Sequence, residues 1–222
     1  IRAVVLRGTD GHFCAGGDIS GMNDAPDTGE NLSEEERQQR AIWNFNRSFG
    51  HMITLVNSAP QVVITVLEGA VLGGGFGLAC ISDVAIADKH AKLSMPETGL
   101  GIIPAQIAPF VVSRIGLTQA RRLALLGERI DGEVARDLGI AHYLTHGSEE
   151  MEAKLADTLK KVRRCAPEAN AVTKALMLRV GTMEHEALLN GAADDFAASL
   201  QSAEGQDGTR AFLEKRLPFW AE

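Results

Sequence analysis

Cysteine is scarce in this chain of 222 residues, which contains Cys14, Cys80 and Cys165 and no others. An odd number of widely spaced cysteines does not make a disulfide framework, so a reduced, cytoplasmic setting suits them better. The sequence also lacks the CxxC and HExxH spacings of common metal sites. His142 and His146 lie four residues apart. On the strand predicted there they would be roughly 13 Å from each other, too far to share an ion. We therefore expect no metal site.

Basic residues are also fewer than acidic residues. Lysine and arginine together number 22 against 29 aspartates and glutamates, which gives a net charge of −7. This balance argues against nucleic acid and anionic membrane surfaces as main partners. Apolar runs long enough to cross a bilayer are also missing. With 45% hydrophobic and 23% charged residues, the composition predicts a globular protein with a sizeable core.

Periodicity predicts an α/β core followed by a helical region. Ser33 and Glu36 form a capping-box pattern at the start of a long amphipathic helix. Strands are expected at 3–6, 61–67, 84–87 and 91–94. From residue 105 onward helices dominate, and they are expected at 107–114, 118–126, 132–138, 149–164, 168–179, 185–202 and 209–216. We therefore expect a core over residues 1–140 and a helical region over residues 141–222.

Four glycines stand together in EGAVLGGGFGLACISD (68–83): Gly73, Gly74, Gly75 and Gly77. Their spacing does not fit GxGxxG, GxxxxGK[ST] or GxSxG, which disfavours a dinucleotide site, a P-loop and a nucleophile elbow. An apolar run feeds a strand into them, and a helix is predicted to follow. The first N–H groups of a helix have no internal partner and favour an anion. A tight strand-to-helix packing contact explains the glycines alone equally well.

A second glycine turn and a lone carboxylate favour the first interpretation. FCAGGD (13–18) also follows a strand, and Glu97 lies in MPETG (95–99). Two such turns can aim two backbone N–H groups at one point, as an oxyanion hole requires. Taken alone, Glu97 is more typical of a solvated loop residue or a helix cap. Together the three elements predict an oxyanion such as an enolate, with Glu97 as the general acid and base beside it.

These stretches resemble the successive signatures of the crotonase superfamily, the enoyl-CoA hydratase/isomerase family. The similarity runs from end to end in FCAGGDI (13–19), EGAVLGGGFGLACISD (68–83), PETGLGIIP (96–104), ARRLALLGERIDGEVARDLGIA (120–141) and GTRAFLEK (208–215). The resemblance implies thioester enolate chemistry and a spiral core of ββα turns. It also implies a helical C-terminal region that forms homotrimers, which often pair into hexamers. Relative to that fold, the chain lacks the opening strands and the first helix.

The resemblance assigns roles to individual residues. It makes Gly17 and Gly74 the two N–H donors to the thioester carbonyl. It implies that the coenzyme A part of an acyl-CoA thioester substrate lies against Ala15, Asp18, Ile19, Phe212 and Lys215, the last two often from a neighbouring subunit. No separate cofactor is implied. Ser20 stands where many members have a lysine for a CoA phosphate.

The sequence departs from the family pattern at the catalytic position. Two-carboxylate hydratases carry a glutamate where this chain has Gly77, so Glu97 is left as the single catalytic carboxylate. We expect hydration of a 2-enoyl-CoA, with Gln106 as a helping side chain. The alternatives are a Δ3,Δ2-enoyl-CoA isomerase or another single-glutamate acyl-CoA enzyme, and an idle CoA-binding relative. Gln106 fits a capping or surface glutamine equally well. The segment PAQIAPFVV (104–112) resembles the isohexenylglutaconyl-CoA hydratase subfamily. We expect Gly77 to free volume for a branched, isoprenoid-derived glutaconyl group.

Overall fold

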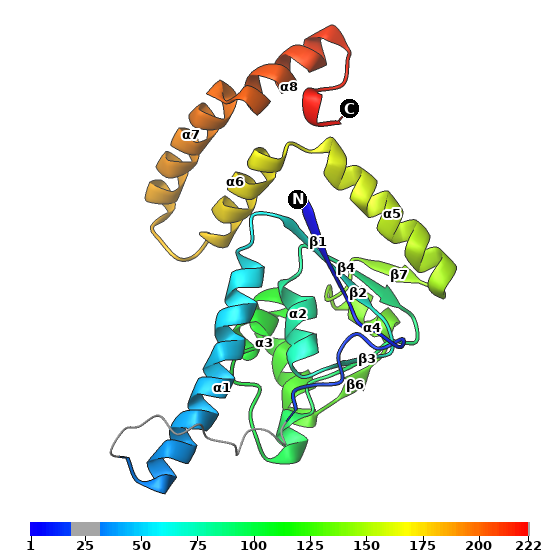
Figure 1. Ribbon diagram of the computed structural model, residues 1–222, viewed down its shortest axis with the longest axis vertical. Helices are drawn as coiled ribbons and strands as arrows, with labels where there is room; N and C mark the ends of the chain where they lie inside the picture. The colour runs from blue at the N-terminus through cyan, green and yellow to red at the C-terminus, as the bar shows by residue number, and fades with distance from the viewer. Residues whose placement is uncertain (19–31, 222) are drawn as a thin grey trace.

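A computed structural model describes residues 1–18 and 32–221, so Ile19 and Ser20 lie outside the described residues. Its larger sheet has four parallel strands in the order β1-β2-β4-β7 (Figure 1). These are β1 (Ala3–Arg7), β2 (Val62–Leu67), β4 (Val84–Asp88) and β7 (Tyr143–Thr145). Residues 63–67 of β2 are all buried, as expected for a central strand covered on both faces. The strands predicted from β-branched runs are therefore present.

A smaller sheet contains β3 (Ala70–Leu72), β5 (Lys92–Ser94) and β6 (Arg129–Ile130). β3 and β5 pair in parallel, and β5 and β6 pair antiparallel. The apolar run before the glycines is thus two strands in two different sheets, because a turn at 68–69 ends β2 before β3 begins. This split takes the glycine cluster out of the larger sheet and places it at the end of β3.

Helices α1 (Glu34–Asn57), α2 (Gly74–Ile81), α3 (Ala108–Leu126) and α4 (Gly132–Asp137) cover the core. The predicted capping box is present, because the Ser33 hydroxyl accepts from the Glu36 N–H and the Glu36 carboxylate accepts from the Ser33 N–H. α2 is the most buried helix, and Phe76 is fully buried among apolar side chains of the strands and of α3. α3 occupies the place of two expected helices, with a non-helical kink at Gly116 between them.

The C-terminal part contains α5 (Ser148–Arg164), α6 (Pro167–Leu178), α7 (His185–Gln201), α8 (Ala203–Glu214) and the short helix η3 (Phe219–Ala221). α8 begins well before the expected residue 209, because the Ser202 hydroxyl caps it by accepting from the Gly205 N–H. α5 packs on the larger sheet through Met151 and Val162. The division into a core and a helical region at residue 140 stays a prediction. Beyond that residue, β7 still belongs to the larger sheet and α5 still packs on it.

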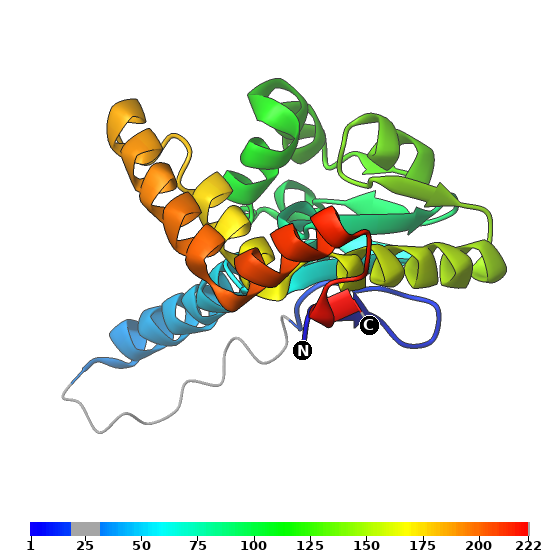
Figure 2. The same cartoon turned by 90° about the horizontal axis from the view of Figure 1, so that it is seen from above.

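We call α6, α7 and α8 the C-terminal arm, which projects to one side of the core (Figures 1 and 2). The Lys174 ammonium ties α6 to the core by donating to Asp83 Oδ2 at 2.6 Å and to the Gln61 carbonyl at 3.1 Å. Asp83 also accepts from the Val63 N–H at 2.7 Å, so one carboxylate joins the arm and β2. In the described part of the chain, no helix is both long and apolar enough to span a bilayer.

Candidate active site

Three neighbouring parallel segments end at one edge of the smaller sheet. Cys14 forms a parallel bridge to Val71, and Leu72 pairs in parallel with Ser94. Backbone hydrogen bonds hold the first pairing, from Cys14 N–H to the Ala70 carbonyl and from Leu72 N–H to the Cys14 carbonyl, both at 2.9 Å. The carboxyl ends of parallel strands meet at the same edge, which is where α/β proteins place their ligand sites.

The three predicted chemical groups all follow these paired positions. Gly17 comes three residues after Cys14, Gly74 three after Val71, and Glu97 three after Ser94. The register therefore carries the two glycines to the same level and the carboxylate beside them. The structure brings together residues that are far apart in the sequence.

Each donor glycine is preceded by a glycine with a left-handed backbone. Gly16 has φ of 108° and Gly73 has φ of 53°, a conformation that glycine adopts at little cost. The turn at Gly73 is held by its N–H, which donates to the Ser94 carbonyl at 3.0 Å. Gly74 is the first residue of α2, so its N–H has no partner within the helix. Among the described residues, neither the Gly74 N–H nor the Gly17 N–H donates to another group of the chain.

Glu97 is held beside these glycines at the start of the short helix η2 (Glu97–Leu100), directly after Pro96. A Cβ placed at Gly73 would lie 3.1 Å from Glu97 Oε1, so the carboxyl group contacts the turn that precedes α2. Glu97 Oε2 is buried and has no hydrogen-bond partner in the described ranges. Burial raises the pKa of Glu97, and a hydrogen bond with its own backbone opposes this effect more weakly. A carboxyl group with a raised pKa is suited to accept and return a proton.

The electrostatics of the site favour a negative charge on a ligand at the N-terminus of α2. The unpaired N–H groups of the first turn carry the positive end of the helix dipole. An oxygen that reached the N–H groups of both Gly17 and Gly74 would be stabilised by both as it gained charge. Glu97 stands next to that place and can exchange a proton with a neighbouring carbon or water.

Gly77 does not leave open space, contrary to our expectation. A Cβ placed at Gly77 would overlap Ile107 Cγ2 and would lie 3.1 Å from Ile53 Cδ1. Ile107 and Ile53 are both buried, so α1 and α3 have filled the volume that a side chain at residue 77 would occupy. The structure therefore gives no pocket for a branched acyl group at this glycine, and room for such a group must come from elsewhere.

The side chain of Gln106, just before α3, is hydrogen-bonded to two residues of α1. Its Nε2 donates to Asn46 Oδ1 at 2.7 Å, and Arg47 Nη1 donates to its Oε1 at 3.4 Å. The ring of Phe49 in α1 lies against Gly74, because a Cβ at Gly74 would lie 2.8 Å from Phe49 Cζ. Sequence reasoning did not connect α1 with the site, since only the tertiary packing of α1 on α2 does so.

The residues assigned to coenzyme A fall into two groups. Ala15 and Asp18 are exposed on either side of Gly17, and Ile19 lies outside the described residues. Phe212 and Lys215 lie in and just after α8, at the opposite end of the molecule from β3 and β6 (Figure 1). Within one chain the structure therefore does not bring Phe212 and Lys215 to Glu97.

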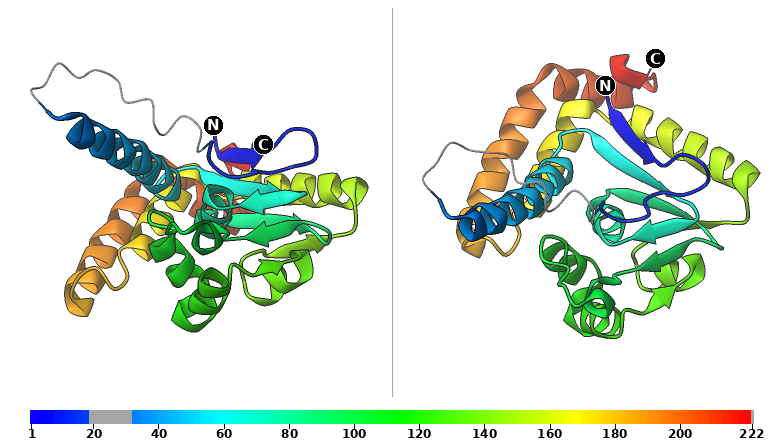
Figure 3. Two further views of the ribbon diagram at one scale, coloured as in Figure 1. Left: turned by 90° about the horizontal axis from the view of Figure 1, so that it is seen from below. Right: turned by 60° about the horizontal axis from the view of Figure 1, so that its bottom comes forward.

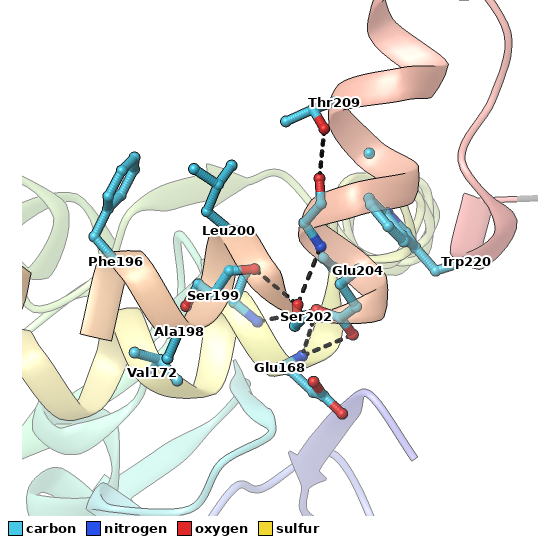
Figure 4. Close-up of a pocket in the computed structure, with 14 residues that line it drawn as sticks. Glu168, Val172, Phe196, Ala198, Ser199, Leu200, Ser202, Glu204, Thr209 and Trp220 are labelled. Atoms are coloured by element: carbon cyan, nitrogen blue, oxygen red, sulfur yellow. Dashed lines mark hydrogen bonds between the residues drawn. The ribbon is translucent and has the colours of Figure 1, made fainter. Parts of the chain in front are cut away.

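A cavity of about 470 Å³ lies in the C-terminal arm, between α6, α7, α8 and η3 (Figure 4). Its lining is mainly apolar and includes Phe196, Leu200 and Trp220. At its floor, the Glu204 carboxylate accepts from the Glu168 N–H at 3.0 Å and so caps α6. The cavity shares no residue with the candidate site, so it is not the place of the predicted chemistry. Within residues 1–18 and 32–221, no three histidine, cysteine, aspartate or glutamate side chains gather in a way that would hold a metal ion.

Comparison with known proteins identifies the family to which this α/β fold belongs. The family model for Enoyl-CoA hydratase/isomerase matches residues 1–222. The chain belongs to the enoyl-CoA hydratase/isomerase family, which confirms the resemblance seen in the sequence motifs at the level of the superfamily. Its α/β fold is that of the solved crotonase-type structures.

Solved structures agree over the whole chain. An enoyl-CoA hydratase/isomerase from Marinobacter aquaeolei is 55% identical, with a TM-score of 0.92 over 100% of this chain and 83% of that one. Pseudomonas aeruginosa AtuE is 52% identical, with a TM-score of 0.88 over 100% of this chain and 82% of that one.

Curated relatives carry both hydratase and isomerase names. A "Probable enoyl-CoA hydratase" of Bacillus subtilis is 29% identical over 98% of this chain and 81% of its own length. A peroxisomal Delta(3,5)-Delta(2,4)-dienoyl-CoA isomerase of Arabidopsis thaliana is 25% identical over 100% of this chain and 80% of its own length. A mitochondrial methylglutaconyl-CoA hydratase of Mus musculus is 25% identical over 98% of this chain and 67% of its own length.

Replacing Glu97 with glutamine is expected to lower turnover without lowering thermal stability at neutral pH. Burial raises the folded-state pKa of Glu97 above its unfolded value, so its protonation stabilises the fold at low pH. That contribution is lost as the pH rises through the raised pKa, and at neutral pH the ionised carboxylate costs stability. We expect Glu97→Gln to melt at or above the wild-type temperature at pH 7, while turnover falls by on the order of 10² to 10⁴. Melting curves from pH 4 to 8 and acyl-CoA assays check both parts. Near-wild-type turnover would remove Glu97 from the chemistry.

Proposed function

We propose that this protein hydrates a 2-enoyl-CoA thioester through an enolate, with Gly17 and Gly74 as the oxyanion donors and Glu97 as the proton carrier. The observation that supports this most is the contact of the Glu97 carboxyl group with the Gly73 turn, next to the unpaired N–H of Gly74. The family supplies the substrate class, an acyl-CoA thioester. The raised pKa of Glu97 suits a group that must both take and give a proton.

The reaction needs only the groups already described. The thioester carbonyl oxygen accepts hydrogen bonds from the Gly17 and Gly74 N–H groups, which polarises the conjugated double bond. The Glu97 carboxylate takes a proton from a water molecule while the water oxygen bonds to C3. The electrons of the C2–C3 double bond move onto the carbonyl oxygen as an enolate. Glu97 then returns the proton to C2, which restores the carbonyl and leaves a 3-hydroxyacyl-CoA.

One carboxylate is sufficient for this sequence of steps, because the proton that leaves water is the one that reaches C2. Gln106 has no part in it, since its amide is engaged with Asn46 and Arg47 on α1. The same single carboxylate would serve a Δ3,Δ2-enoyl-CoA isomerase by moving a proton from C2 to C4. The isomerase is therefore the competing function, and the product distinguishes the two.

For the acyl group, we propose a branched, isoprenoid-derived glutaconyl-CoA such as isohexenylglutaconyl-CoA. The support is the resemblance of residues 104–112 to that subfamily and the similarity to a methylglutaconyl-CoA hydratase. The absence of a second carboxylate at residue 77 also helps, because a substrate with its own carboxylate would otherwise meet a like charge at short range. A cytoplasmic location stays a prediction from the cysteine content.

Two substitutions at Gly74 test the oxyanion donor as a matched pair. Gly74→Pro removes the N–H, and proline is well tolerated at the first position of a helix. Gly74→Ala keeps the N–H and brings the same Cβ toward Phe49. We expect the proline variant to lose about 3 kcal/mol more transition-state stabilisation than the alanine variant, measured as kcat/KM. Circular dichroism serves as the folding control. Equal activity of the two variants would rule out the Gly74 N–H as a donor.

Substrate preference tests the reaction and the acyl group. We expect isohexenylglutaconyl-CoA to be hydrated at least about tenfold faster than crotonyl-CoA, because about 1.4 kcal/mol of better fit in the transition state gives that factor. Product analysis by mass spectrometry shows whether water has been added. A faster reaction with crotonyl-CoA would favour a short-chain hydratase, and a shifted double bond without added water would favour the isomerase. If no acyl-CoA were turned over, the protein would be interpreted as a catalytically idle CoA-binding relative.

The proposal includes assembly into a homotrimer, or a hexamer of two trimers, through the helical region over residues 141–222. The C-terminal arm exposes large apolar side chains in the single chain: Phe196 is 70% exposed and Phe212 is 83% exposed. Exposed apolar surface of this kind marks an interaction site. A neighbouring subunit would then cover the arm and could bring its own Phe212 and Lys215 to the coenzyme A bound by another chain.

Light scattering of the full-length protein at micromolar concentration is expected to give the mass of a trimer or hexamer. Phe196→Glu should shift that mass downward, because burying an unpaired carboxylate in an interface is costly. Gln201→Glu adds the same side chain to an exposed polar position of the same helix, and it should leave the mass unchanged. A wild-type monomer would contradict the proposed assembly.

A further inference from the structure

Helix α1 packs against α2 beside the candidate site. Its Phe49 ring lies on Gly74 and its Ile53 lies on Gly77, so α1 and α2 run side by side in the same direction. α1 is much longer than α2 and continues past it (Figures 1 and 3). The residues just before Phe49 therefore project beyond the N-terminus of α2, on the side where the proposed thioester carbonyl would bind.

Three polar side chains meet at this place, and we call them the Asn46–Arg47–Gln106 cluster. The Gln106 amide donates to Asn46 Oδ1 at 2.7 Å and accepts from Arg47 Nη1 at 3.4 Å. All three side chains are half-buried, on a helix face and a loop that are otherwise largely apolar. Gly50 makes room for them, since a Cβ there would overlap Gln106 Oε1 and lie 2.6 Å from Arg47 Nη1. Glycine inside a helix lowers the stability of that helix, so the space for these side chains comes with a less stable α1.

Within residues 1–18 and 32–221, no opposite charge pairs with the positive charge of this cluster. Arg47 has five N–H donors, and in the described part of the chain its partner is the neutral amide oxygen of Gln106. No carboxylate of the described residues pairs with it, whereas Arg7, Arg122 and Arg216 each pair with at least one. A half-buried guanidinium flanked by two amides is a good receptor for a carboxylate, which accepts several hydrogen bonds from such a fork.

We propose that Asn46, Arg47 and Gln106 bind a second carboxylate on the acyl group of the substrate, at the end away from the thioester. The inference rests on the proposed function, because it places the thioester carbonyl at Gly17 and Gly74 and lets the acyl chain run toward α1. It assigns a ligand to a polar cluster that the hydration steps do not use. It also gives the enzyme a physical reason to prefer glutaconyl-type over simple enoyl thioesters, since a carboxylate would meet a cation instead of a second glutamate.

The test measures binding, so it does not depend on the reaction catalysed. The probes are 3-methylglutaryl-CoA and its monoamide, which have nearly the same shape and differ in the charge of the distal group. Isothermal titration gives the dissociation constant of each with the wild type, Arg47→Met, Gln106→Glu and the control Arg121→Met. Arg121 is an exposed residue of α3. Thermal melting of each variant confirms that it is folded.

We expect the wild type and Arg121→Met to bind the acid about tenfold to a hundredfold more tightly than the amide, the range that a charge-assisted hydrogen bond commonly gives. Arg47→Met should abolish this preference by weakening the binding of the acid much more than that of the amide. Gln106→Glu should do the same, because its carboxylate would occupy Arg47. An unchanged preference in Arg47→Met, or an equal loss of both ligands, would overturn the proposal. Hydration measured separately on a neutral enoyl-CoA reports on the proposed function alone.

Discussion

The candidate site depends on the parallel pairing of three short stretches of chain: residues 13–14, β3 and β5. The bridge from Cys14 to Val71 and the pairing of Leu72 with Ser94 fix how far each stretch reaches before it turns. A shift of one residue in either pairing would reverse which face each side chain points to and would separate the donors from the acid. The proposed chemistry thus rests on backbone register. The two left-handed glycines precede the two N–H groups that have no partner among the described residues.

The charges around the candidate site are arranged to suit a ligand oxygen that becomes negatively charged. The N-terminus of α2 presents positive potential, while Glu97 is half-buried with one oxygen that has no partner among the described residues. No second carboxylate stands at residue 77, and the guanidinium of Arg47 lies on the neighbouring helix. A neutral carbonyl that becomes an oxyanion gains most in such surroundings, because the dipoles are already oriented when its charge develops. The thioester carbonyl of the product is neutral again, so it leaves these donors more easily than an oxyanion would.

Much of this could be predicted from the sequence, wherever a local rule decides the outcome. The capping box at Ser33, the buried strands and the strand–glycine–helix order at Gly74 follow from short-range preferences, and the family followed from motifs in combination. The contents of the space beside Gly77 could not be predicted, because Ile53 and Ile107 reach it from remote segments. The contact of Phe49 with Gly74 and the pairing of Gln106 with α1 were missed for the same reason. Each depends on how α1 and the loop before α3 pack on α2, which no local pattern encodes.

The two tryptophans of the chain divide between the two regions described above. Trp43 stands on the projecting part of α1, one turn before Arg47, and 63% of its surface is exposed. Trp220 packs on Gly208 of α8, and its Nε1 donates to the Arg164 carbonyl at 3.2 Å. The intrinsic fluorescence of this protein therefore has two spectrally separable sources. A solvent-exposed indole emits at longer wavelength than a packed one, so Trp43 would respond to a ligand at the proposed carboxylate site and Trp220 to the proposed subunit contact on the arm. One emission spectrum would then follow both proposals.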